Sequence, residues 1–236
     1  AETWARRVGA PVWGARAPRR FFTDNHWCAP LKWNREAEQD GVRRRVFCAS
    51  MADVFEDRRD LDEWRNRLWR LIEATPQLDW LLLTKRPERV AALANWRDGL
   101  WPGHVWLGTT VETQIWAGKR LPALAAVPAA VRFVSCEPLL GPLNLTPWLG
   151  TDVQWVIAGG ESGPHSRPSN PAWFRSLRDQ CLDAQTAFHF KQWGNWSPAE
   201  AAASASRTLS GQAMVRLDKR TAGRVLDGQT WDQLPA

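Results

Sequence analysis

The sequence predicts an α/β fold, an incomplete parallel (β/α) barrel of about six strands. Three observations predict it. Six short apolar segments recur along the chain, helical patterns lie between most of them, and each segment runs into polar residues at its carboxyl end. Near-continuous apolar runs are typical of parallel strands that are covered on both faces. Right-handed crossovers between such strands lead either to a barrel or to an open doubly wound sheet.

The predicted strands divide the chain into a partial barrel, residues 1–196, and a second part, residues 197–236. In chain order the strands are Arg45–Ser50, Trp80–Thr84, His104–Thr109, Val131–Ser135, Val153–Ala158 and Ala187–Phe190. Residues 1–8 have a helical pattern from the first residue, and residues 10–44, rich in Trp, Pro and Arg, are expected to form an irregular wrap around the first strand. The second part is expected to be a mobile loop over 197–210 and then a tail packed on the barrel.

Helical periodicity is clearest in two stretches between the strands. Asp60–Ala74 places its apolar residues on one stripe and is ended by a Thr-Pro pair. Asn170 followed by Pro171 is the cap and first-turn signal of another helix. Pro87–Trp96 and Thr113–Ala126 are weaker helical stretches. This alternation of strand and helix indicates repeated β-α units.

Composition and charge narrow the class of protein. No window approaches the roughly 20 apolar residues of a membrane-spanning helix, and no secretory signal begins the chain, so we expect a cytoplasmic protein without a membrane partner. The net charge of +6, with basic runs such as residues 43–45, suits nucleic acid as a partner, although such runs are also common on solvated faces. The four cysteines and four histidines lack metal-ligand spacing, so no metal ligand is assigned.

Polar residues follow every predicted strand, at the end where β/α folds build their ligand sites. The candidate binding residues are Ser50, Asp53, Lys85, Arg86, Glu112, Gly159, Gly160, Glu161, Ser162, Gln192 and Trp193, and the candidate catalytic residues are Cys136, Glu137 and Lys191. Because parallel strands end at the same edge of a sheet, we expect these side chains to converge on one pocket.

The charged candidates each have a functional and a structural interpretation. Lys85 and Arg86 suit a clamp for phosphate or carboxylate, but they also suit a helix start that faces water. The three glutamates suit a metal, an amino group or an acid–base role. Asp53 and Glu137 alternatively cap the helices that follow them.

The uncharged candidates are equally open to two interpretations. The Gly-Gly-Glu-Ser segment at 159–162 leaves backbone room for a ligand and suits an anion nest, or it is a tight loop that needs positive φ angles. The Lys-Gln-Trp segment at 191–193 offers a cation, an amide and a stacking surface for a nucleobase, or its Trp is a lid on the core. Cys136 sits beside a carboxylate as a nucleophile would, but an inert buried thiol is the favoured interpretation.

Several long strings of unusual composition carry a family resemblance. They are RRRVFCASMADVFE, WLLLTKRPE, VWLGTTVE, VRFVSCEPLLGPLNL, WVIAGGESGPHSRP, FKQWGNW and AGRVLDGQTWDQLP. With them the chain resembles the phage protein family named for gene products 37 and 68. That family is also called the three-cysteine-motif family and is similar to radical SAM enzymes. The resemblance runs in order from Ala1 to Pro235.

The resemblance implies that the intact protein binds a [4Fe–4S] cluster and S-adenosylmethionine at the strand-end rim, with the chemistry belonging to the cofactor. The family's cysteine motif ends in Cys-Tyr-Ala-Glu, and this sequence matches it only from Ala1-Glu2 onward. The resemblance therefore also implies that the first barrel strand and every cluster ligand are missing, and that this fragment is inactive. By residue type, the acidic candidates suit the amino group or ribose and the basic ones a carboxylate or phosphate.

Two other functions remain open at the level of sequence. One is a non-catalytic module that binds nucleic acid or a protein partner on a degenerate barrel, which predicts salt-sensitive binding through the basic residues. The other is a metal-assisted hydrolase that uses the carboxylates of the rim.

Overall fold

The structure is a computed structural model that describes residue 14 and residues 17–49, 52–199, 207–209 and 211–235. The predicted helix over residues 1–8 and the candidate Ser50 lie outside the described residues. Among the described helices, none combines the length and the apolar character that a membrane span requires.

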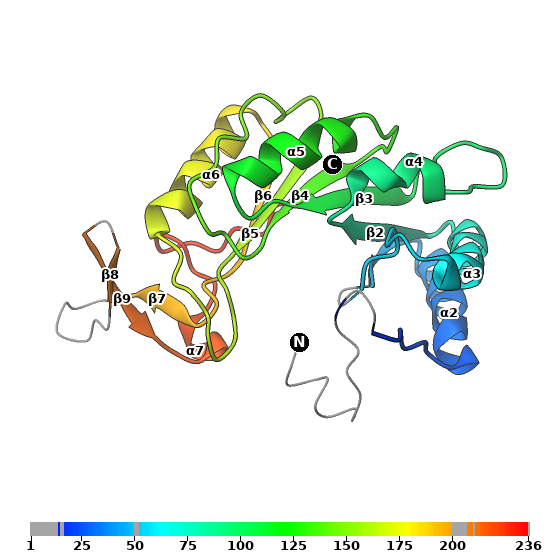
Figure 1. Ribbon diagram of the computed structural model, residues 1–236, viewed down its shortest axis with the longest axis horizontal. Coiled ribbons are helices and arrows are strands. Elements are labelled where there is room, and N and C mark those ends of the chain that lie inside the picture. Colours follow the sequence, from blue (N-terminus) through cyan, green and yellow to red (C-terminus); the bar gives the residue numbers. More distant parts are fainter. Residues whose placement is uncertain (1–13, 15–16, 50–51, 200–206, 210, 236) are drawn as a thin grey trace.

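Six parallel strands form one curled sheet with the shape of half a barrel (Figure 1). They are β1 (Arg44–Cys48), β2 (Leu78–Thr84), β3 (Val105–Thr110), β4 (Arg132–Cys136), β5 (Trp155–Gly159) and β6 (Ala187–Gln192), and they lie in the sheet in the order in which they occur in the chain. All six predicted strands are confirmed, with bounds that move by two residues at most. Every neighbouring pair is parallel, so the carboxyl ends of all six strands meet at one rim.

Helices lie along the outer side of the curl (Figure 1). They are α2 (Asp24–Asp40), which precedes β1, and α3 (Asp62–Glu73), α4 (Val90–Leu93), α5 (Gln114–Ala125) and α6 (Pro171–Asp183), with short 3-10 turns η1 (Arg59–Leu61) and η2 (Pro87–Arg89). The short helix α7 (Lys219–Ala222) lies elsewhere, beside β7 (Trp196–Pro198) of a second, smaller sheet (Figure 1). The predicted cap of α6 is confirmed, because the Asn170 side chain accepts a hydrogen bond from the Ala172 N–H at 3.0 Å.

The expectation of irregular structure over residues 10–44 was wrong for α2, which spans 17 residues. The sequence pattern does not indicate this helix, for a physical reason. Pro30 stands inside the helix, and the buried residues of α2 are only Pro30 and Ala37, so no apolar stripe marks the helical period. The helix ends at Gly41, whose φ of 65° allows its N–H and that of Val42 to bond the last turn.

The two ends of the segment expected as a mobile loop, residues 197–210, are strands. A small antiparallel sheet is built from β7 (Trp196–Pro198), β8 (Arg207–Leu209) and β9 (Gln212–Arg216) in the order β7-β9-β8. Residues 200–206 and 210 are not among the described residues. Buried Trp196 and Met214 anchor this sheet, and the Trp196 indole donates a hydrogen bond to the Ser166 carbonyl at 2.9 Å.

The sheet buries apolar side chains on both faces. The outer face and the helices enclose the larger core, which includes Ile72, Leu82 and Phe174. The face turned away from the helices, called the inner face here, carries a second cluster formed by sheet residues, Leu81, Trp106, Val131, Phe133, Trp155 and Ile157. Alternation along each strand separates the two sets, so residues that continue the inner face toward the rim are in register with one another.

Candidate ligand-binding rim

The carboxyl ends of the strands bring most of the predicted charged residues to one edge of the sheet. Four groups then form two ion pairs, Lys85 with Glu112 and Glu137 with Lys191. We call these four residues the rim quartet. The members come from the ends of four different strands, so the topology of the sheet and not local sequence places them together.

Glu112, just after β3, is the most extensively paired member of the rim quartet. Its carboxylate accepts hydrogen bonds from the Lys85 ammonium and, at 3.0 Å, from the Arg120 guanidinium of α5. Burial disfavours its ionised form, but these bonds and the nearby positive charges outweigh burial and hold the pKa of Glu112 below its ordinary value. Glu112 is therefore a carboxylate at neutral pH, with 16% of its side chain exposed.

Glu137, just after β4, reaches past β5 to its partner on β6. The Lys191 ammonium donates to the Glu137 carboxylate at 2.9 Å. Gly159 of β5 lies beneath this path, because a Cβ atom there would come within 2.7 Å of the Glu137 Oε1 atom. The space that sequence analysis assigned to a ligand beside Gly159 is thus filled by the Glu137 side chain. A side chain at position 159 would force the Glu137 carboxylate to shift, so the glycine favours this path across the strand.

The two pairs form a line of charge along the rim. In strand order it runs from the positive Lys85 through the negative Glu112 and Glu137 to the positive Lys191. Thr110 of β3 and Ser135 of β4 are partners in register, so Glu112 and Glu137, two residues further on, follow neighbouring strands. Both carboxylates also act electrostatically on the thiol of Cys136. The lysine side chains are half exposed, at 50% for Lys85 and 52% for Lys191. Solvent, and hence a ligand, can reach the outer ends of the line.

Asp53 and Arg86 form a separate hydrogen-bonded group beside the rim quartet. The Asp53 carboxylate accepts hydrogen bonds from the backbone N–H groups of Phe55 and Lys85, from the Thr84 hydroxyl and from the Arg86 guanidinium, at 2.8 to 3.1 Å. Four donors satisfy this group almost completely. Asp53 therefore joins the loop after β1 to the end of β2, and Arg86 supports it.

The loop after β5 packs tightly against the loop after β6. A Cβ atom on Gly160 would lie 1.9 Å from the Trp193 carbonyl oxygen, so only glycine fits. Glu161 accepts two hydrogen bonds from the Arg167 guanidinium, which lower its pKa against the opposing effect of burial. Ser162 lies 3.4 Å from the Gln192 amide, which also lies 3.4 Å from Glu137. These contacts hold the two loops together beside the rim quartet.

Cys136 and Trp193 lie in the outer core. Cys136 is fully buried, and burial raises the pKa of its thiol well above its ordinary value. Trp193 is 4% exposed, packs between Phe174 and Phe190, and donates its indole N–H to the Val225 carbonyl. Neither side chain can touch a ligand at the rim without leaving the core.

Arg120 is a site residue that sequence analysis missed. It is 7% exposed, and its guanidinium donates to the Thr110 carbonyl at 2.7 Å as well as to Glu112. The signal was present, because Arg120 stands on the same face of α5 as the buried residues Ala117, Leu121 and Leu124. An arginine on the core side of a helix needs an acidic or carbonyl partner, and the preceding strand end supplies both.

The described residues do not provide ligands for an iron–sulfur cluster. No group of three His, Cys, Asp or Glu side chains is gathered among them in a way that could hold a metal ion. Cys28 is exposed on α2, Cys48 lies on β1, and Cys136 and Cys181 are buried in the core. Burial raises the pKa of Cys48 and of Cys181 to about 12, whereas a cluster binds thiolates.

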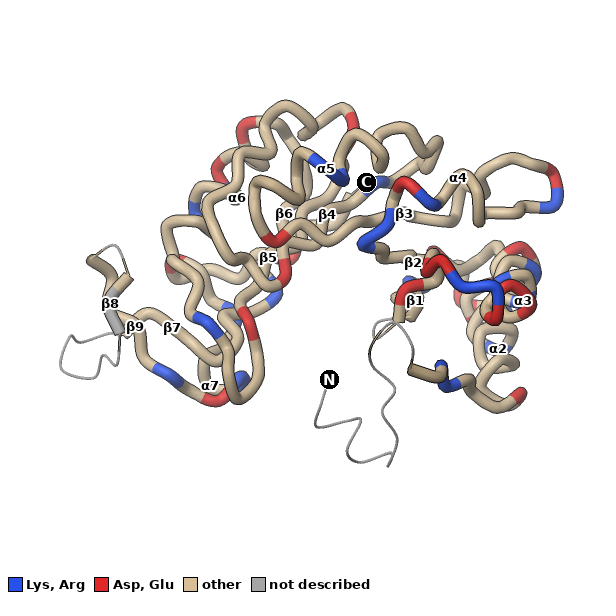
Figure 2. Tube along the Cα trace, viewed as in Figure 1, with Lys and Arg blue, Asp and Glu red and all other residues tan. Residues whose placement is uncertain are grey.

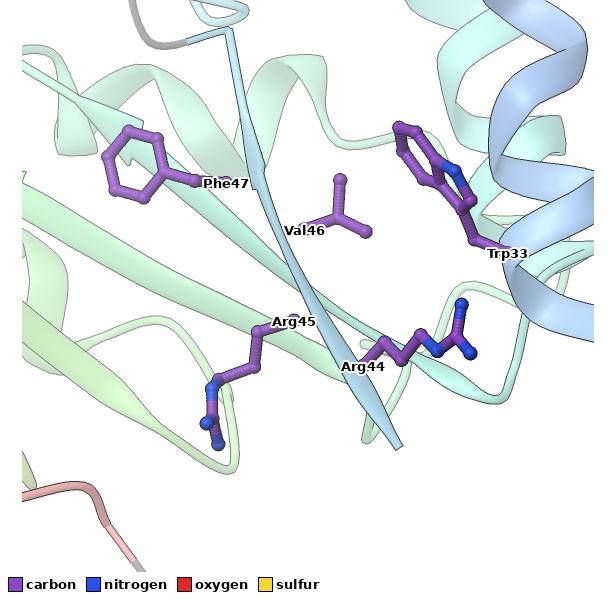
Figure 3. A pocket seen from close by; sticks show the side chains of 5 residues that line it. All are labelled: Trp33, Arg44, Arg45, Val46 and Phe47. Atoms are coloured by element: carbon purple, nitrogen blue, oxygen red, sulfur yellow. The ribbon is translucent and has the colours of Figure 1, made fainter. Parts of the chain in front are cut away.

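A hollow of about 400 Å³ lies away from the rim, beside the edge strand β1 (Figure 3). Trp33 of α2 and the strand residues Arg44, Arg45, Val46 and Phe47 line it. It lies beside β1, which pairs with no strand other than β2 among the described residues, and its lining includes none of the carboxylates of the rim quartet. We therefore place the candidate site at the rim, where paired charges converge, and not in this hollow.

The fold and the rim define an α/β half-barrel protein with ion-paired charges at the carboxyl ends of its strands. Over residues 1–235 the chain matches the model of the family described as protein of unknown function DUF5131, and it belongs to that family. No curated protein matches the chain, and no solved structure does.

Proposed function

We propose that the rim quartet binds a ligand carrying the charges of an α-amino acid, and that this ligand is S-adenosylmethionine. The observation that carries the proposal is the line of charge along the rim. Two neighbouring carboxylates suit the ammonium and sulfonium groups of the ligand, and a flanking lysine suits its carboxylate. The resemblance to radical SAM enzymes, drawn from the motif strings, points to the same ligand.

The energetics favour exchange of partners at this site. Partly exposed ion pairs contribute only about 0–1 kcal/mol each, so a ligand can replace Lys85 or Lys191 at little expense in folding free energy. The carboxylates are mostly buried, and in such a site their attraction for a cation is less screened than in water. When such a ligand separates a lysine from its glutamate, the cation of the ligand can pair with the glutamate and its carboxylate with the lysine. Neither side chain is then left unpaired.

The roles of the residues follow from their positions. Glu112 and Glu137 would hold the cationic groups, Lys85 or Lys191 would hold the carboxylate, and Arg120 would keep Glu112 in place. S-adenosylmethionine, when bound, supplies an activated carbon–sulfur bond. The described cysteines do not fit a [4Fe–4S] cluster, so we derive no step that passes through one.

The two other functions have weaker support. Basic and acidic positions are interspersed along the chain (Figure 2), and Arg43 and Arg44 of the basic run are paired with Asp79, Glu36 and Asp40. A nucleic acid would have to displace these partners. A metal-assisted hydrolase would need carboxylates that converge on one point, whereas Glu112 and Glu137 each face a lysine.

Calorimetric titration of the chain with S-adenosylmethionine tests the proposal. We expect Glu112→Gln to weaken binding about tenfold, because an amide cannot neutralise the cation of the ligand. Glu36→Gln is the matched control, since Glu36 is also paired with an arginine but lies on α2, away from the rim. Its affinity should equal that of the wild type.

Acid should weaken this binding as well. Because the pKa of Glu112 is held below its ordinary value, the contribution of Glu112 to the affinity should persist at about pH 4.3, the usual pKa of a glutamate, and be lost only below it. A wild-type chain that does not bind S-adenosylmethionine, or a Glu112→Gln chain that binds it as tightly, would refute the proposal.

A further inference from the structure

We infer that Trp116, near the start of α5, is the stacking platform for the planar base of a nucleoside-containing ligand at the rim. The inference rests on the proposed function for the position of the ligand, but its evidence is separate. It concerns a partly exposed aromatic side chain that lies beside the rim quartet.

Trp116 is one of two exposed tryptophans, with Trp33, among those that the structure describes. Most of the described ones are buried or half-buried, whereas Trp116 is 40% exposed and its neighbour Ile115 is 69% exposed. Both lie in the first turn of α5, which begins directly after the rim. Together they give the start of α5 an exposed apolar surface beside the charged rim, which the base of a ligand can cover.

The indole is connected to the rim quartet through one side chain. The Arg120 guanidinium lies 4.0 Å from the centroid of the Trp116 ring, and the same guanidinium donates to Glu112 at 3.0 Å. Because Arg120 is buried and is also bonded to the Thr110 carbonyl, it gives the ring a fixed support on one side. Only the Arg120 side chain therefore separates the Trp116 ring from a ligand cation that is bound by Glu112.

A nucleobase is the chemical group that fits this arrangement. Stacking on an exposed indole recognises any planar ring, and a base linked to an amino-acid moiety would place its two ends on Trp116 and on the rim quartet. The Lys119 ammonium also lies near the ring, 5.1 Å from its centroid. Such an exposed cation–π contact is weak, so the base can displace this flexible side chain.

Binding of three probes to the full chain tests the inference: S-adenosylmethionine, adenosine, which lacks the amino acid, and methionine, which lacks the base. We expect Trp116→Ala to weaken binding of the first two about tenfold or more and to leave methionine binding unchanged. Trp116→Phe should retain an intermediate affinity. Trp33→Ala is the matched control, because Trp33 is similarly exposed, at 37%, but lies beside β1.

Fluorine NMR of the chain labelled with 5-fluorotryptophan locates the contact. The resonance that is missing from the spectrum of Trp116→Phe should be the one that shifts when adenosine is added. A shift of other resonances only, or wild-type affinity of Trp116→Ala for adenosine, would overturn the inference.

The probes separate this inference from the proposed function. If methionine binds and neither adenine-containing probe does, the inference fails while an amino-acid site stands. If adenosine binds through Trp116 but S-adenosylmethionine and methionine do not bind, the proposed function fails and the inference stands. If none of the three probes binds, both are refuted.

Discussion

The two edge strands of the half-barrel differ in what covers them. The edge of β6 is covered by the tail of the chain, since the Phe190 N–H donates to the Trp231 carbonyl at 2.9 Å and the Gln233 N–H donates to the Phe188 carbonyl at 3.2 Å. Strand β1 pairs only with β2 among the described residues, so no strand lies along its outer edge there. Phe47 of β1 is 44% exposed.

This difference shows two ways of dealing with an unpaired strand edge. Covering it satisfies the backbone groups and adds buried apolar area, but it makes the strand dependent on a distant segment of the chain. Among the described residues no strand covers the outer edge of β1, and this strand begins with two arginines, which discourage pairing with another copy. The following predictions test how much the stability of each edge strand depends on the feature that protects its edge.

The largest effect is expected from Leu226→Ala in the tail. Leu226 is fully buried in the outer core, and its carbonyl accepts the indole N–H of Trp231 at 3.3 Å. Removing the side chain should lower the free energy of unfolding by about 2–4 kcal/mol in urea titrations. Val46→Ala on β1 should lower it by only about 1 kcal/mol, because that residue is half-buried. Equal losses at the two positions would show that the edges do not differ in stability.

A smaller, pH-dependent effect is expected at Asp227, which attaches the tail to α6. Hydrogen bonds from Arg175, followed by those from Arg178, lower the pKa of Asp227 against the opposing effect of burial. A lowered pKa means that the stabilisation is complete above the unfolded-state value of about 3.9 and is lost as the pH falls below it.

Hydrogen exchange measures this loss at the covered edge. Protection of the Phe188 and Phe190 amides should fall a few-fold more steeply on acidification than protection of amides in β3, because partly exposed ion pairs contribute at most about 1 kcal/mol each. Asp227→Asn should show the reduced protection already at neutral pH, with no further steepening. Parallel loss in β3 and β6 would contradict a local role of Asp227.

The smallest effect on stability is expected from Phe47→Lys on the open edge. Phe47 is largely exposed, so its replacement should change the free energy of unfolding by no more than about 0.5 kcal/mol. It should nevertheless reduce association at high protein concentration, measured by light scattering, because a lysine opposes edge-to-edge pairing. Leu182→Lys is the control, as Leu182 is similarly exposed but lies on α6. An equal reduction by both variants would point to net charge and not to the edge.

The parallel sheet could be predicted because its strands are buried on both faces and therefore have continuous apolar runs. The convergence of the charged residues followed from that prediction alone. Helix α2 could not be predicted, since Pro30 and a mostly exposed surface remove the helical period. Its ends are determined by capping and by packing beside β1, which a local pattern does not show.

The pairing of side chains at the rim could not be predicted from the sequence either. That Asp53 accepts four hydrogen bonds, and that Glu137 crosses β5 to Lys191, depends on distances between strands and not on spacing in the chain. Cys136 is the opposite case. Strand alternation places it on the face opposite Glu137, and its burial agrees with the favoured interpretation of an inert thiol.

Gly159 has one consequence for the evolution of this rim. Because a Cβ atom at position 159 would lie 2.7 Å from the Glu137 Oε1 atom, a single methyl group there would force this carboxylate to shift relative to Lys191. The geometry of an ion pair between the ends of β4 and β6 thereby depends on a neutral residue of the strand between them. A mutation that alters no charged residue can therefore change how the charges of the rim are arranged.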